Sequence, residues 1–279
     1  MNPPENSDQR VQAILASGIK IPPIPVILLR LNELLRDPDT DAAALAALIS
    51  HDGALSGAVF RVIGSPVFGL RSKVDSLPHA ISLLGLQTIG TLLRSEILVA
   101  SLSDPQHARA LEKLWQRSAA IAELCLRTVK TARLRNINAE AAYMIGMFHD
   151  CGLALLCKRF PVYAQALSTG DGWPDIPALD QSQNLSHAVM GQMVAKNWAL
   201  PEILVQAIRH HHDPIEADVH TDTQRLCGVL NLAIHLYDRQ HEIDDPDWAA
   251  HGRADTMQRL GADADQLDQW QADILSDAA

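Results

Sequence analysis

The sequence predicts an all-α protein, and three observations lead to this fold class. Ala and Leu dominate a chain that is 47% hydrophobic, whereas aromatic residues make up only 4%, a mixture that favours packed helices over sheets. Apolar residues recur at helical spacing along most of the chain, and no stretch shows the alternation expected of a half-buried strand. Pro, Gly and capping residues divide the chain into segments of helical length. The 279 residues suffice for one large domain or two small ones.

The first part of the chain is expected to form short helices that end at polar, Gly or Pro positions. Pro25 suits a first helical turn, and an apolar face follows it as far as the break at Asp37 and Pro38. Gly85 separates two apolar segments in the same way. The segments expected to be helical are 9–16, 26–35, 42–51, 54–63, 77–84 and 87–101.

Longer helices are expected after the Asp104-Pro105 break. Asn138 and Ser186 are suitable N-cap residues for two of them. The expected helices are 106–130, 139–158, 187–198, 201–212 and 223–239, followed by a short helical tail. The remaining segments are polar or acidic and are expected to be loops: 168–184, 214–222 and 242–252.

The helix expected over 139–158 is apolar on nearly every face but carries His149 and Asp150 in its middle. A buried histidine and carboxylate are costly unless a hydrogen-bond partner or a metal ion binds them. Downstream, His187 and the pair at 211–212 are candidate ligands for the same ion. Successive helical residues lie about 100° apart, so we expect His210 to face away from the site. The alternative is a structural doublet and a polar helix end with no metal.

Composition argues against several classes of function. The formal net charge of −10 disfavours a general binder of nucleic acid or of anionic membranes. The polar N-terminus lacks a signal-peptide core, and no uncharged apolar run reaches the roughly 18 residues of a membrane span. The four cysteines form no CxxC pair and are expected to be reduced core residues of a cytoplasmic protein.

Several segments together resemble the HDOD family (HD-related output domain), a branch of the HD and HD-GYP metal phosphohydrolases. The segments are IPPIPVILLRLNELL at 21–35, DGAL at 52–55, AISLLGLQTI at 80–89, LWQRSAAIA at 114–122, MFHDCGLALL at 147–156, HAVMGQMVAKNWALPEILVQAI at 187–208 and HHDP at 211–214. The resemblance implies an HD-like helical domain with an additional N-terminal helical layer. The implied divisions are an N-terminal arm and short helix at 1–18, an HDOD domain at 19–245 with halves 19–104 and 105–245, and a C-terminal helical tail at 246–279.

The resemblance also implies a set of metal ligands, since HD enzymes hold two ions. The implied candidates are His149, Asp150, His187, His211 and His212. Two positions depart from the pattern: Arg117 stands where an early histidine would fall, and Ile234 where a final aspartate would fall. An inward-facing Arg117 would replace one ion with a permanent positive charge, whereas an outward-facing one would be solvated. Asp238, one turn beyond Ile234, is an alternative carboxylate.

These departures lead us to expect a non-catalytic signalling module that acts through a protein partner or a small ligand such as a nucleotide. We expect the binding surface in the cleft between the two halves. The alternative is a metal-dependent phosphohydrolase or phosphodiesterase with a degenerate site that holds at most one metal ion. In a third interpretation one ion acts as a sensor or structural staple. Three imidazoles and a carboxylate would suit Fe, Zn or Ni, and no other cofactor is expected; the sequence leaves the oligomeric state open.

Overall fold

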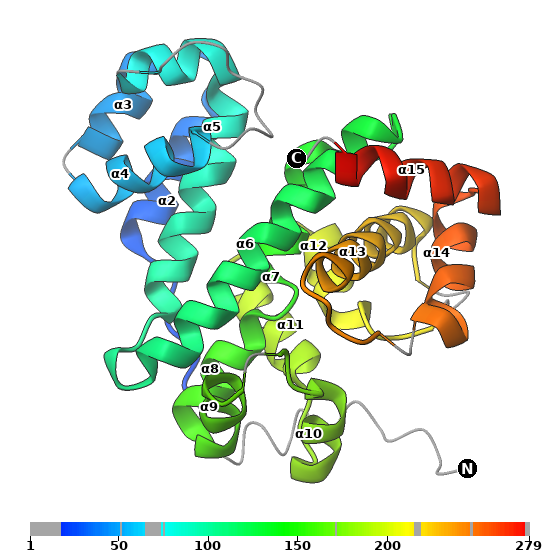
Figure 1. The fold of residues 1–279 in the computed structure, drawn as a ribbon. Coiled ribbons are helices and arrows are strands. Elements are labelled where there is room, and N and C mark those ends of the chain that lie inside the picture. The colour runs from blue at the N-terminus through cyan, green and yellow to red at the C-terminus, as the bar shows by residue number, and fades with distance from the viewer. Residues whose placement is uncertain are drawn as a thin grey trace. The chain divides into compact units, whose positions relative to one another are not determined.

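The computed structural model describes residues 18–50, 52–64, 74, 76–170, 172–214, 219–245 and 248–276. These residues form helices and connecting turns without any strand, so the all-α prediction is confirmed (Figure 1). They divide into two compact units: Pro23–Leu102, and the residues before Pro23 together with those from Ser103 onward. The short helix expected over 9–16 and most of the turn expected over 64–66 lie outside the described residues.

The unit Pro23–Leu102 is a cluster of four helices packed around α5. The helices are α2 (Val26–Arg36), α3 (Ala42–Ser50), α4 (Gly53–Ile63) and α5 (Leu77–Leu102). Leu28, Leu45 and Ile89, from three of them, are fully buried. Gly85 breaks α5 with φ 82° and ψ 159°, a left-handed conformation that glycine adopts without steric cost. The sequence predicted this break.

Helix α5 is the only helix of the described chain whose length and composition would allow it to cross a membrane. Core helices of globular proteins pass the same test, and 44% of the apolar window of α5 is buried within the structure. The helix also changes direction at Gly85 and packs against α2, α3 and α4. These features are typical of a core helix.

The other unit is built around α6. Its helices are α6 (Ala108–Thr131, after the 3₁₀ turn Pro105–His107), α7 (Ala139–Phe148), α8 (Cys151–Arg159), α9 (Pro161–Ser168), α10 (Ile176–Gln183), α11 (His187–Asn197), α12 (Glu202–His210), α13 (Thr221–Gln240), the π-helical turn Trp248–Gly252, α14 (Arg253–Leu260) and α15 (Ala264–Ser276). Helix α6 packs against α7, α9, α13 and α15. Its apolar face, including Leu114, Ile121 and Cys125, is fully buried.

Two predictions about the path of the chain are wrong. The helix expected over 139–158 is interrupted at the His149-Asp150 doublet, because Asp150 leaves helical geometry with φ −100° and ψ 13°. The segment expected as a loop over 168–184 contains α10, whose first turn is capped by the Asp175 side chain accepting a hydrogen bond from the backbone N–H of Ala178. The doublet therefore lies at a junction between two helices.

Gly152 lets α8 lie directly against α11. A Cβ atom at this position would collide with the carbonyl oxygen of His187 and would lie 2.6 Å from the backbone nitrogen of Gly191. Both obstacles are backbone atoms, so no side-chain rotation could relieve the collision. The close approach places Asp150, at the start of α8, beside His187, at the start of α11.

Candidate metal centre

The carboxylate of Asp150 is buried and faces different groups with its two oxygens. Oδ1 lies 3.3 Å from Nε2 of His187 and 3.6 Å from Nε2 of His211. Oδ2 lies 3.2 Å from Nε2 of His149 and 3.6 Å from a guanidinium nitrogen of Arg117. The carboxylate therefore has a histidine side and an arginine side.

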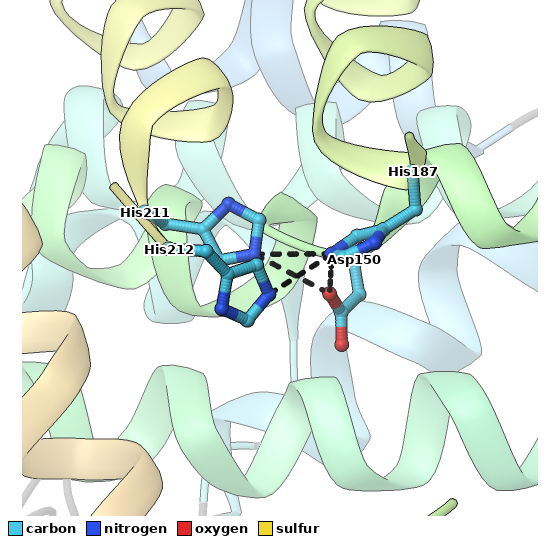
Figure 2. Close-up of side chains that lie close together, drawn as sticks. All are labelled: Asp150, His187, His211 and His212. Carbon is cyan, nitrogen blue, oxygen red and sulfur yellow. Dashed lines mark hydrogen bonds and ion pairs between the residues drawn. The ribbon is translucent and has the colours of Figure 1, made fainter. Parts of the chain in front are cut away.

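Three imidazoles converge on the histidine side from two separate parts of the chain (Figure 2). Ser186 caps α11 and places His187 in its first turn, and His211 and His212 directly follow α12. The Nε2 atom of His187 lies 3.3 Å from that of His211 and 3.1 Å from that of His212. One ligand atom from each of these histidines and from Asp150 lies within 4.8 Å of the others. This spacing suits a single shared ion.

Hydrogen bonds to the other ring nitrogens fix the orientation of two of these histidines. Nδ1 of His187 donates to Asp180 at 2.7 Å, and Nδ1 of His211 donates to the carbonyl oxygen of Ile208 at 2.7 Å. Asp180 also accepts from the Tyr163 hydroxyl at 2.7 Å and from the backbone N–H of His187 at 2.8 Å. When Nδ1 donates, a neutral imidazole presents a lone pair at Nε2. The facing Nε2 atoms and the Asp150 oxygen thus require a proton or a metal ion between them.

The charges at the cluster follow from this arrangement. Burial alone would raise the pKa of Asp150, but the imidazole of His149 and hydrogen bonds from His187 and His211 hold that pKa well below its usual range. Burial would lower the pKa of His187, but Asp150 and Asp180 raise it to about 9. Burial lowers the pKa of His211. Without a metal ion, His187 therefore carries a second proton, at Nε2, at neutral pH, and a bound cation would displace that proton.

These residues fit a divalent transition metal. Imidazole nitrogens with a carboxylate oxygen suit Zn, Fe or Ni, and a carboxylate behind a ligating histidine, as Asp180 lies behind His187, is the usual outer partner in such sites. A bound ion would be held by the four residues of Figure 2 and would supply Lewis acidity toward water or an anionic ligand. A cavity of about 390 Å³ borders His211 and His212.

The guanidinium of Arg117 occupies the arginine side of Asp150. The residue lies on α6 and is only 5% exposed. A second guanidinium nitrogen lies 3.4 Å from Asp238, and the group stacks 4.4 Å from the ring centre of Trp173 and 5.4 Å from that of Tyr237. Arginine stays protonated at any physiological pH. A fixed positive charge, held by two carboxylates and two aromatic rings, therefore lies beside Asp150.

The other histidines of the region are not among the four cluster residues, although His149 contacts Oδ2 of Asp150. His149 donates from Nδ1 to the carbonyl oxygen of Gly146 at 2.9 Å, and its buried Nε2, on the Oδ2 side, lacks hydrogen-bond geometry to any described group. His210 bonds Asp213 at 2.9 Å and is not one of the clustered ligand residues. His235 bonds Asp245 at 3.0 Å.

Sequence reasoning missed Asp180, Trp173 and Tyr237, all of which contact site residues. Asp180 was not considered because its segment was expected to be a loop. The Asp175 cap followed by Pro177 in the first turn is a helix-start signal that would have predicted α10. No sequence signal that we recognise would have placed Trp173 over Arg117. Ile234, where the resemblance would place an aspartate, lines the 390 Å³ cavity.

Comparison with known proteins agrees with this fold. The HDOD domain family model matches residues 21–214. An uncharacterised protein of Treponema pallidum (strain Nichols) is 26% identical over 222 residues, which are 78% of this chain, and the chain spans 43% of that protein's length. An HDOD domain protein with unknown function from Geobacter sulfurreducens has a TM-score of 0.70 at 21% identity, covering 97% of this chain and 95% of that one. A "Putative phosphohydrolase" from Shewanella amazonensis SB2B has a TM-score of 0.68 at 21% identity, covering 97% and 93%. The chain belongs to the HDOD domain family.

Proposed function

We propose that this protein is a cytoplasmic regulatory module that binds a signalling protein or a small ligand and does not catalyse two-metal hydrolysis. Its HD-type site would hold at most one divalent ion, at Asp150, His187, His211 and His212. The observation that carries the proposal is the buried guanidinium of Arg117, 3.6 Å from the second oxygen of Asp150.

Two-metal hydrolysis needs two cations about 3.5–4 Å apart that share a bridging carboxylate, activate water and clamp the phosphate. One oxygen of Asp150 already faces Arg117, which can pair with a carboxylate but offers no coordination position for water. Asp238 is paired with the same guanidinium and so is not a free ligand for a second ion. A scaffold with an accessible cavity but only one set of ligands favours binding over turnover.

A phosphohydrolase with a single ion is the competing function. The convergent ligands and the Asp180 partner of His187 support it, as does the name of the Shewanella amazonensis protein. One ion could polarise a phosphate oxygen and lower the pKa of a bound water. Metal content and turnover distinguish the two functions.

Metal content tests how many ions the site accepts. We expect at most one equivalent of divalent metal in wild-type protein titrated with Mn²⁺, Fe²⁺ or Zn²⁺ and then desalted. Arg117→His, which removes the fixed charge and adds an imidazole, is expected to accept a second ion. Arg117→Lys, which retains a positive charge, is the matched control and should behave as wild type. Two equivalents in the wild type would contradict the proposal.

Turnover tests the regulatory assignment directly. Wild-type protein with Mn, Fe or Mg should not hydrolyse cyclic dinucleotides or model phosphate esters above the background rate. If a contaminating phosphatase caused the turnover, preparations of His149→Ala and Asp150→Ala would show the same activity as wild type. Turnover by the wild type that disappears in both variants would establish the phosphohydrolase instead.

A further inference from the structure

A second recess, lined by none of the metal-centre residues, lies where the α6–α7 connection meets α13 and the end of α14. Its volume is about 370 Å³. Its polar wall consists mainly of three arginines, Arg133, Arg135 and Arg225, and its apolar part includes Leu134 and Leu260. No carboxylate lines it. The proposed function assigns no role to this recess.

The three arginines of the recess, of which Arg133 and Arg135 are exposed, have few opposite charges around them. Arg225 approaches Asp222 at 3.4 Å, near the start of α13, whereas the side chains of Arg133 and Arg135 have no ion pair within the described part of the chain. The whole chain carries a net charge of −10, so a local group of three cations runs against its composition. Like charges around one small recess repel one another, and an anion placed between them would remove that repulsion.

The backbone at Arg133 gives an independent reason to examine this side chain. Arg133 follows the end of α6 with φ +52°, and the backbone N–H groups of Arg133 and Leu134 donate to the carbonyl oxygens of Lys130 and Val129. In this type of helix end the left-handed position favours glycine, because a Cβ atom is disfavoured there. The turn itself does not need an arginine. A cation near the C-terminus of α6 would also interact favourably with the helix dipole, and the experiment below separates that role from ligand binding.

We propose that this recess binds a small phosphorylated ligand. Guanidinium groups recognise phosphate oxygens through paired, charge-assisted hydrogen bonds, and three arginine residues lining one recess would suit a group with two or more negative charges. The amide of Asn136 adds a neutral donor. The apolar part of the recess would contact the organic portion of the ligand, and the volume lies within the usual range for small-molecule sites. The ligand would regulate the module from a place separate from the metal centre, and this proposal does not rest on metal binding.

Calorimetric titration of the full chain tests the proposal. The protein is first treated with EDTA, so that no metal ion can bind phosphate, and ionic strength is held constant with chloride. The probes are inorganic phosphate, pyrophosphate and adenosine diphosphate. We expect saturable binding of pyrophosphate, weaker binding of phosphate, and the tightest binding for adenosine diphosphate if the apolar part contacts the base or sugar. Equal affinity for pyrophosphate and adenosine diphosphate would refute that apolar contact.

Arg133→Gly separates binding from folding. Glycine suits the backbone at this position, so the melting temperature without ligand should stay the same or rise, while the affinity for pyrophosphate should fall at least tenfold. Arg135→Ala should weaken binding to a similar degree. Ala199→Gly makes the same backbone change at another left-handed helix end, φ +51°, and Arg109→Ala removes an exposed arginine elsewhere on α6. Both controls should bind as wild type.

Three results would overturn the proposal. One is the absence of saturable binding for all three probes. Another is an equal loss of affinity in Arg109→Ala, which would indicate a general charge effect. The third is wild-type affinity in Arg133→Gly and Arg135→Ala, which would leave these arginines with the helix-end role alone.

Discussion

Replacing Gly152 with alanine tests how the fold positions Asp150 beside His187. The added methyl group would collide with the carbonyl oxygen of His187 and lie 2.6 Å from the backbone nitrogen of Gly191. Favourable contacts between non-bonded atoms lie at about 3.5–4 Å. We therefore expect α8 and α11 to separate by at least about 1 Å, which moves Asp150 away from His187.

The magnitude follows from the nature of the obstacle. Adding a methyl group to a well-packed core costs about 1–3 kcal/mol, and values are smaller where a flexible side chain can rotate away. Here the nearest atoms belong to the backbone of α11, so we expect a loss near the top of this range, about 3 kcal/mol. That is a large part of the roughly 5–15 kcal/mol by which domains are stable.

Urea denaturation with and without a divalent ion measures both effects. Gly152→Ala should lower the free energy of unfolding and weaken metal binding together. Gly57→Ala is the matched control: it lies inside α4, a methyl group there would meet nothing within 4 Å, and alanine should stabilise the helix by about 0.5–1 kcal/mol. If Gly152→Ala unfolds within about 0.5 kcal/mol of wild type and binds metal as tightly, the α8–α11 contact does not position the site.

Three further predictions concern other parts of the same unit. Ala199→Gly should raise the free energy of unfolding by about 1 kcal/mol in urea denaturation, because it removes the Cβ atom that disfavours the left-handed backbone at this position. A decrease would contradict this. The hydrogen bond from His235 lowers the pKa of Asp245, so the bond stabilises the fold above about pH 4 and is lost as pH falls through the lowered pKa. Asp245→Asn should thus lower the free energy of unfolding by less than about 1 kcal/mol at pH 7, and this difference from wild type should shrink in acid. A difference that stays constant with pH would refute this. Burial raises the pKa of four buried thiols, those of Cys125, Cys151, Cys157 and Cys227. These thiols should therefore resist iodoacetamide at pH 8 until the protein unfolds. Reaction of any of them in the folded protein would contradict this.

The sequence predicted most helices because their ends carry local signals. Asn138 and Ser186 cap α7 and α11 as expected, and Gly85 breaks α5. The break at Asp150 was not predicted, because apolar residues of good helix propensity lie on both sides of it. The interruption depends instead on groups distant in sequence, such as His187 and His211, that face the carboxylate. Local propensity contains no information about such contacts.

The site was less predictable than the fold. Spacing along the chain could not show that His187 and His211 meet at Asp150, and only the family resemblance suggested it. The inward direction of Arg117 was left open, since a single arginine on an amphipathic helix is more often solvated. It points inward because Asp238 and the ring of Trp173, both far away in the sequence, provide its partners.

Under the proposed function, the balance of buried charge favours one ion over two at this centre. Asp150, Asp180 and Asp238 together carry three negative charges when ionised, and Arg117 offsets one of them. One divalent ion on the histidine side would neutralise the remaining two, whereas a second would leave two uncompensated positive charges in a buried region, close to the guanidinium. Uncompensated buried charge costs several kcal/mol even after relaxation. We therefore expect Arg117 and a second ion to exclude each other, and Arg117→His to differ from Arg117→Lys because only the histidine removes the fixed charge.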